Sequence, residues 1–446
     1  MSGELPNLPD DILKELIKGT NVKFCQTCKK LDELRPETGI LEVRSASKGM
    51  TLEQISRLQT RVNYNKVDLD LTEVETNNDY SLLPGLARKF PNLVAFRLHD
   101  TQLFNTVRMF SRAISQSLQH CPYITTLDLS DCQATDLGMR GIFQTLQTLD
   151  FLKNINVQNN NLNLINADDI ANTLPRIKML ETLQIGQNKI SRTGGHNLGS
   201  VLHACTSLQV LGFKYDSRDL KIQGLAPGLA QCTTLRKLDL YGIEMGIQGM
   251  YAFAPSLSLC SWLTVLNIGF NKLFDEGASV LASALSGLSS LTTLELESNE
   301  IEDEGCESIA KGIIDCPTLQ VLNLSANEFG VIGVQHLCQA LPHCTNLTVL
   351  SLEWNLIRDD GARSLAAILP VQSSLKELDL GQNEITDIGA TALAQALGLP
   401  LSLSKLNLDL NNFSDVKHIA SVLSDANVNP GLRVTTKPLD DSMDIS

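Results

Sequence analysis

The chain has 446 residues, of which 43% are hydrophobic and only 5% aromatic, and its formal net charge is −14. A negative charge of this size disfavours nucleic acid and anionic membranes as partners, whereas a basic protein is compatible with it. No apolar run reaches the ~18 residues that a membrane-spanning helix needs, and the first residues lack the charged-then-apolar pattern of a secretory signal. We therefore expect a cytoplasmic, intracellular protein.

Residues 1–60 precede the repetitive part of the chain and are predicted to form a small helical cap, which a repeat array needs to cover its first apolar edge. An amphipathic helix near the start has an apolar face, and its candidate contact residues are Leu8, Pro9, Ile12, Leu13 and Leu16. A second helical stretch at 24–34 contains Cys25 and Cys28. No second Cys pair or nearby His pair accompanies them, so we expect no metal site and no cofactor.

This order of Leu-Pro, amphipathic helix and later Cys-Lys segment resembles an F-box. The resemblance implies that Leu8, Pro9, Ile12, Leu13 and Leu16 contact the adaptor subunit of a cullin-type ubiquitin ligase, while the rest of the chain holds a substrate. The link between the two helical stretches is shorter than in F-boxes, and Leu31 stands where an aromatic residue is common. A plain cap and an F-box are both compatible with the segment.

From residue 61 to 430 the phrase Leu-x-x-Leu-x-Leu-x-x-Asn recurs with a period of 28 residues, and it predicts about 12 to 13 repeats. Its opening residue lies without a slip at Leu263, Leu291, Leu319, Leu347, Leu375 and Leu403. Apolar and polar residues alternate in each phrase, as in Leu294-Glu-Leu296, which predicts a strand with one buried face. The Asn at the turn is expected to form a hydrogen-bonded ladder between repeats, and a one-sided helix follows it.

Parallel stacking of these strand–turn–helix units predicts an α/β horseshoe solenoid. Strands would line its concave side, because they stack about 4.8 Å apart whereas helices are about 10 Å wide. The repeats resemble the leucine-rich repeats of the 28-residue, ribonuclease-inhibitor-like subtype. This resemblance covers about three quarters of the chain and implies a protein–protein interaction scaffold.

Cysteines follow the same register. Six of the eleven precede the opening apolar residue of a repeat by three positions: Cys121, Cys205, Cys232, Cys260, Cys316 and Cys344. A fixed repeat position indicates small buried packing residues rather than disulfides, which agrees with a reducing compartment.

The residues between the apolar ones of each strand are predicted to face the cavity. Acidic residues gather among them in the C-terminal half, together with exposed aromatic residues, and this combination is typical of a protein-binding surface. The candidate partner-binding residues are Tyr215, Tyr241, Phe270, Glu295, Glu297, Glu353, Trp354, Asp379 and Asp409. We expect a basic protein partner on the concave face.

Catalytic motifs are missing from the chain, including a nucleophile elbow, a phosphate loop and a zinc-protease signature. We therefore predict no enzyme and no catalytic residue. The Ran GTPase-activating protein shares the repeat subtype and the acidic character, so activation of a Ran-like GTPase is an alternative function that the resemblance implies.

Residues 431–446 lose the repeat pattern and are predicted to form an acidic disordered tail. A eukaryotic regulator and a bacterial effector acting in a host cytosol would both fit this sequence. The identity of the partner and the oligomeric state do not follow from it.

Overall fold

The computed structural model describes residues 40–44, 66–71, 80–98, 107–164, 169, 172–215, 222–429 and 431–438. The chain forms two compact units, Met1–Leu220 and Lys221–Ser446. Both units are built from the strand–turn–helix repeat that the 28-residue period predicts.

Parallel strands form the framework of the first unit. They are β1 (Ile40–Arg44), β2 (Lys66–Asp70), β3 (Leu93–Arg97), β4 (Thr126–Asp128), β5 (Asn154–Asn156), β6 (Thr182–Gln184) and β7 (Val210–Gly212). The helical segments are α3 (Leu83–Lys89), α4 (Val107–Leu118), α5 (Asp136–Leu146), η2 (Leu174–Arg176) and α7 (Arg192–Leu202). Strands pair in chain order, and the middle residue of each strand pairs with the middle residue of the next, as Leu127 does with Ile155, except that Phe96 rather than the central Ala95 of β3 pairs with Leu127.

The second unit repeats this arrangement with greater regularity. Its strands are β8 (Lys237–Asp239), β9 (Val265–Asn267), β10 (Thr293–Glu295), β11 (Val321–Asn323), β12 (Val349–Ser351), β13 (Glu377–Asp379), β14 (Lys405–Asn407) and β15 (Arg433–Thr435). Its helices are α8 (Ile222–Leu229), α9 (Gly246–Leu257), α10 (Phe274–Leu285), α11 (Asp303–Ile313), α12 (Val331–Ala340), η3 (Leu341–His343), α13 (Arg358–Ile368), α14 (Asp387–Leu397) and α15 (Val416–Ala426).

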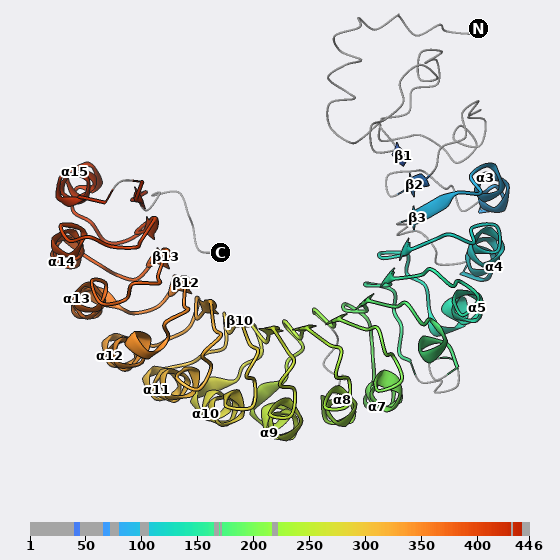
Figure 1. Ribbon diagram of the computed structural model, residues 1–446, viewed down its shortest axis with the longest axis horizontal. Coiled ribbons are helices and arrows are strands. Elements are labelled where there is room, and N and C mark those ends of the chain that lie inside the picture. Colours follow the sequence, from blue (N-terminus) through green and yellow to red (C-terminus); the bar gives the residue numbers. More distant parts are fainter. Residues whose placement is uncertain are drawn as a thin grey trace, which may run out of the picture. The chain divides into compact units, whose positions relative to one another are not determined.

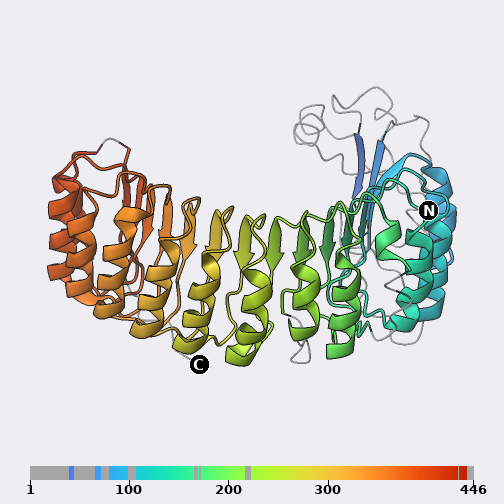
Figure 2. The same cartoon turned by 60° about the horizontal axis from the view of Figure 1, so that its bottom comes forward.

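Helices lie along one side of the strands in each unit, and the other side of the strands is not covered by helices (Figure 1). Figure 2 shows the same arrangement from a second direction, with the helices of each unit side by side in chain order. Leu294 and Leu296 are fully buried between strand and helix, while Glu295 between them is only half-buried. This alternation confirms the prediction of an α/β solenoid of stacked repeats.

The predicted asparagine ladder is present. Asn299 is fully buried; its Nδ2 donates to the carbonyl oxygens of Ile268 and Leu296, at 3.0 Å each, and its Oδ1 accepts from the backbone N–H of Asn271 at 3.1 Å. The backbone N–H of Asn299 donates in turn to Oδ1 of Asn327 at 3.0 Å. Each amide therefore joins neighbouring repeats and satisfies the buried backbone groups of the turn.

Aspartates near the helix N-termini form a second set of links between repeats. Asp359 of α13 accepts hydrogen bonds from the backbone N–H groups of Thr386 and Gly389, at 2.8 and 2.9 Å, and so caps the following helix α14. Asp303 does the same for α12 through Gly330 and Gly333. These caps connect consecutive helices as the asparagines connect consecutive turns.

The six cysteines at the shared repeat position are buried and free, as predicted for packing residues. The Cys316 thiol lies 3.4 Å from the carbonyl oxygen of Leu285 in the previous repeat, and burial raises its pKa to about 12. Such a thiol is a weak nucleophile, which agrees with a structural role.

Both ends of the strand ladder extend beyond the predicted array boundaries at 61 and 430. Strand β1 lies inside the segment expected to be a helical cap, and it pairs with β2. The segment expected to be a disordered tail begins with β15, because Arg433–Thr435 adds to the exposed edge of β14. None of the described helices has the length and apolar character needed to cross a membrane.

Candidate protein-binding surface

Two rows of side chains cross the uncovered side of the strands in the second unit. One row lies two residues beyond the end of each strand and is called the acidic row after its three acids, Glu297, Glu353 and Asp409. Its other members are Tyr241, Gly269, Ser325, Gly381 and Lys437. The left-handed row lies one residue further and consists of Gly242, Phe270, Ser298, Ala326, Trp354, Gln382 and Leu410. Successive strands are about 4.8 Å apart, so each row places one side chain per step of that length.

All members of the left-handed row have φ between 50° and 67°. Inter-repeat hydrogen bonds hold this conformation: the N–H of Phe270 donates to Glu297 O at 2.7 Å, and the N–H of Trp354 donates to Gly381 O at 3.0 Å. Glycine and asparagine adopt such φ values readily, whereas other residues lose about 1–2 kcal/mol. Phe270 and Trp354 are 50% and 58% exposed, so neither backbone preference nor burial accounts for them.

Tyr241 and Phe270 form one aromatic pair on this surface. Their rings are stacked, with centroids 6.0 Å apart and an interplanar angle of 15°. Gly269 makes room for the arrangement, because a Cβ at that position would lie 2.9 Å from both Cδ2 of Tyr241 and Cγ of Glu297. The pair and Glu297 therefore meet at one place.

Glu295 and Glu297 lie on adjacent outward positions of one repeat. Oε2 of Glu297 accepts a hydrogen bond from Nδ2 of Asn323 at 2.9 Å. Burial raises the pKa of Glu295, and the Glu297 carboxylate raises it further. The two acids thus form a half-buried negative site beside the aromatic pair.

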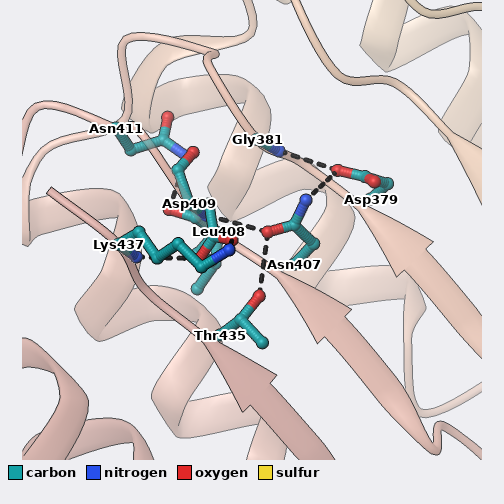
Figure 3. Close-up of polar contacts among 8 residues, drawn as sticks. All are labelled: Asp379, Gly381, Asn407, Leu408, Asp409, Asn411, Thr435 and Lys437. Carbon is teal, nitrogen blue, oxygen red and sulfur yellow. Dashed lines mark hydrogen bonds and ion pairs between the residues drawn. The ribbon is translucent and has the colours of Figure 1, made fainter. Parts of the chain in front are cut away.

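A second acidic cluster surrounds Asp379 near the C-terminal end (Figure 3). Oδ1 of Asp379 accepts hydrogen bonds from the backbone N–H of Gly381 at 3.0 Å and from Nδ2 of Asn407 at 2.8 Å. Asp409 accepts a 2.7 Å hydrogen bond from the backbone N–H of Lys437, whose Nζ lies 3.6 Å from the second carboxylate oxygen. Lys437 therefore offsets part of the charge expected of Asp409.

Glu353 completes this cluster, and its carboxylate makes no hydrogen bond or ion pair within the described part of the chain. Burial raises the pKa of its carboxyl group, and the charges of Asp379 and Asp409 raise it further. Three carboxylates and one lysine give this cluster two net negative charges, and Trp354 directly follows one of its acids, Glu353, in the sequence. On the described residues no other ring stacks on the Trp354 indole.

The remaining candidates lie elsewhere. Tyr215 belongs to the first unit, where it is 46% exposed and has Nζ of Lys214 at 5.7 Å from its ring centroid. The candidate adaptor-contact residues Leu8, Pro9, Ile12, Leu13 and Leu16 lie outside the described residues.

Two features of the surface were not predicted from the sequence pattern. Lys437 follows Asp409 at the repeat distance, but the apolar phrase that marks a strand is missing there. The left-handed φ of Phe270 and Trp354 is a property of the turn, and the only sequence signal for it is Asn159, Gly242 and other permissive residues at equivalent positions.

A family model described as "Leucine Rich repeat" matches residues 120–143, 259–282, 287–310, 315–338, 343–366 and 371–394. Among solved structures, an internalin (inlF) from Listeria monocytogenes is similar with a TM-score of 0.50 and 17% identity, over 87% of this chain and 89% of that one. An internalin C2 from the same organism is 24% identical over 54% of this chain and 84% of its own, with a TM-score of 0.34. No curated protein sequence matches the chain significantly.

These comparisons agree with the geometry: the chain carries leucine-rich repeats and has the α/β solenoid fold of such proteins. At this level of identity the likeness concerns the fold and not a partner. Within the described residues, no group of three or more His, Cys, Asp or Glu could hold a metal ion.

Proposed function

We propose that the protein is a protein-interaction scaffold whose second unit binds a basic protein partner on the uncovered side of its strands. The observation that carries the proposal is the pair of exposed aromatic residues Phe270 and Trp354, held at left-handed positions that disfavour them. Residues that oppose the backbone preference and remain exposed point to a requirement other than folding.

The spacing of these aromatic residues suits an extended contact. Phe270 and Trp354 are three repeats apart, roughly 15 Å at the usual strand spacing. Ser298 and Ala326 lie between them and leave room for a partner's side chains. Aromatic residues in this setting are typical anchors of protein interfaces.

The charges beside each anchor indicate the kind of partner. Glu297 meets Tyr241 of the aromatic pair at Gly269, and Glu295 lies close to Glu297. Glu353 directly precedes Trp354 in the sequence and lies close to Asp379. Lys and Arg side chains of a partner would relieve the mutual repulsion of these carboxylates. Electrostatic complementarity of this kind favours association and partner choice more than affinity.

The test is affinity capture by the full chain, followed by mass spectrometry and by titration of the purified partner. Replacing both Glu353 and Trp354 with Ala should weaken the partner's binding at least about tenfold, because it removes an anchor and its neighbouring charge. Tyr251→Ala is the matched control, since Tyr251 is also an exposed aromatic residue but lies on helix α9. Equal binding by all three proteins, or a partner whose binding does not weaken with salt, would contradict the proposal.

Finer hypotheses remain predictions. The ribonuclease-inhibitor-like subtype would place the protein near the Ran GTPase activators, and GTP turnover on a panel of Ran-like GTPases tests that activity. The F-box-like hypothesis rests on residues 1–60, and capture of a cullin adaptor by the full chain, compared with a chain lacking 1–36, tests it. The cytoplasmic location is likewise a prediction, which fluorescence microscopy of the tagged protein can check.

A further inference from the structure

Helices α3, α4 and α5 of the first unit carry an unusual charge for this acidic chain. They contain five basic residues, Arg88, Lys89, Arg108, Arg112 and Arg140, and one acidic residue, Asp136. Helices α10 to α15 of the second unit contain nine Asp or Glu residues and four Lys or Arg residues. The chain's net charge of −14 thus conceals a basic surface on these three helices.

Three of the arginines line one groove between α4 and α5. Arg108 and Arg112 come from α4 and Arg140 comes from α5, around an open volume of about 430 Å³. Arg108 and Arg112 are four residues apart and so project from the same face of their helix. Leu137, which is 58% exposed, forms an apolar part of the lining.

Small residues on both helices form another part of the lining. A Cβ at Gly141 would lie 3.0 Å from Oγ of Ser111 and 3.6 Å from Oγ of Ser115. The helices can approach closely there because neither side carries a large side chain. The arginines therefore border a groove that contains hydroxyl groups.

Several polar groups of this groove have no partner. Oγ of Ser115 is buried and makes no hydrogen bond, and neither Arg108 nor Arg112 has a hydrogen bond or ion pair through its side chain in the part of the chain that the structure describes. Arg140 pairs with Asp169, with Nε and Oδ1 3.2 Å apart. Three guanidinium groups and one carboxylate leave two net positive charges.

This arrangement matches a phosphate group. A guanidinium group presents a planar set of donors that fits phosphate oxygens, and a phosphorylated side chain carries about −1.5 to −2 charges near neutral pH. The hydroxyl of Ser115 can donate one further hydrogen bond. Extended polyanions and anionic membranes fit poorly, because the rest of the chain would repel them, whereas a single dianion interacts mainly with charges within about 10 Å.

We propose that the groove between α4 and α5 binds the phosphate of a phosphorylated Ser or Thr side chain in a protein partner, with the apolar side chain of Leu137 contacting a neighbouring residue of that partner. Arg108 and Arg112 hold the phosphate oxygens, and Arg140 adds charge from the opposite helix. The site is separate from the proposed binding surface on the strands and does not depend on it.

The test uses the full chain and fluorescein-labelled peptide pools of random sequence around a central phosphoserine or phosphothreonine. The phosphorylated pool should bind with increased fluorescence anisotropy, and the unphosphorylated pool should not. Changing both Arg108→Gln and Arg112→Gln should weaken binding at least about tenfold, since two charge-assisted donors are lost. Ser115→Ala should give a smaller loss.

Arg363→Gln is the matched control. Arg363 lines a groove of about 540 Å³ between α13 and α14 that is otherwise formed mostly by apolar residues. The substitution Arg363→Gln should therefore leave phosphopeptide binding unchanged. Circular dichroism would verify that the Arg108/Arg112 double variant is folded. The proposal would be overturned if both peptide pools bound equally, or if the double variant bound the phosphorylated pool as tightly as wild type. It would also be overturned if the phosphorylated peptides failed to bind and only vesicles containing phosphatidylinositol bisphosphate did.

Discussion

The two units share one repeat but differ in what they place at equivalent surface positions. In the first unit the left-handed row contains Asp131, Asn159, Gln187 and Tyr215, and the row beside it contains Ser130, Gln158, Gly186 and Lys214, without an acid. The second unit places Phe, Trp and Leu in the left-handed row and Glu and Asp in the acidic row. On helices α3 to α5 of the first unit the charge is instead basic.

This difference shows which positions the fold leaves free. Buried leucines are shared by both units because each packs against its own copy in the next repeat. Outward positions make few such contacts, so each unit can present its own surface. We infer that the two units recognise different chemical groups.

Substitutions in the asparagine ladder should cause the largest change in unfolding free energy. Asn299→Ala removes at least three buried hydrogen bonds in the second unit, and we expect a loss of about 3 kcal/mol of unfolding free energy. In the first unit Asn160 and Asn188 also occupy the ladder position, but one repeat earlier Cys132 stands there instead, and its thiol contacts the Leu98 carbonyl oxygen at 3.1 Å. Cys132→Ala should cost only about 1 kcal/mol, because a thiol is a weak donor.

Urea unfolding followed by circular dichroism measures both values. The exposed Asn412, next to a ladder residue in the sequence, provides the control Asn412→Ala, which should be close to neutral. Equal losses for Asn299→Ala and Cys132→Ala would show that the asparagine amide contributes no more to stability than the cysteine thiol at the ladder position.

Acidic residues on the uncovered side should make the second unit sensitive to pH. Burial and the charges of Asp379 and Asp409 raise the pKa of Glu353, so its ionisation opposes folding. The stability that protonated Glu353 contributes is fully present below the ordinary glutamate pKa of 4.5. It is lost as the pH rises through the raised pKa of the folded protein. Glu353→Gln should therefore be more stable than wild type at about pH 7 and similar to it at about pH 4.

Asp359, in the same repeat but at the helix end, should behave in the opposite way. Burial works against its ionisation, but hydrogen bonds from Thr386 and Gly389 outweigh this and lower its pKa below 3.8. Asp359→Asn should be less stable than wild type at about pH 7, and the difference should shrink as pH falls through the lowered value. Melting temperatures of both variants and wild type between about pH 3 and pH 7 test both directions of change. If the two variants changed in stability with pH in the same direction, the opposite roles given to Glu353 and Asp359 would be wrong.

Trp354→Asn should have the smallest effect on stability. It converts the second unit's left-handed position to the residue found at Asn159 in the first unit, and asparagine tolerates this φ better than tryptophan. We expect a gain of about 0.5 kcal/mol in unfolding free energy together with weaker partner binding. Thermal unfolding measures the effect, with Gln382→Asn in the same row as the control. A clear loss of stability in Trp354→Asn would mean that the indole contributes to folding.

Much of the candidate surface followed from the register, because a strand with period-2 alternation exposes every second side chain. Glu295 and Glu297 are outward neighbours for this reason, and Tyr241 and Phe270 stand in adjacent rows of consecutive repeats and stack. The pairing of Lys437 with Asp409 could not be predicted, because β15 forms only where β14 offers an open edge. The grouping of Arg108, Arg112 and Arg140 also required knowledge of which helix faces meet.

The sequence by itself determined the repeat, the strands, the buried leucines and cysteines, and the asparagine ladder. These features are periodic, and in a stacked array a periodic residue always meets its own equivalent in the next repeat. Only the tertiary structure decided the contacts of residues that occur once, such as Lys437 on the strand side and the arginines on the helix side. A residue without a repeated equivalent carries no register, so its neighbours depend on how adjacent turns and helices pack in space.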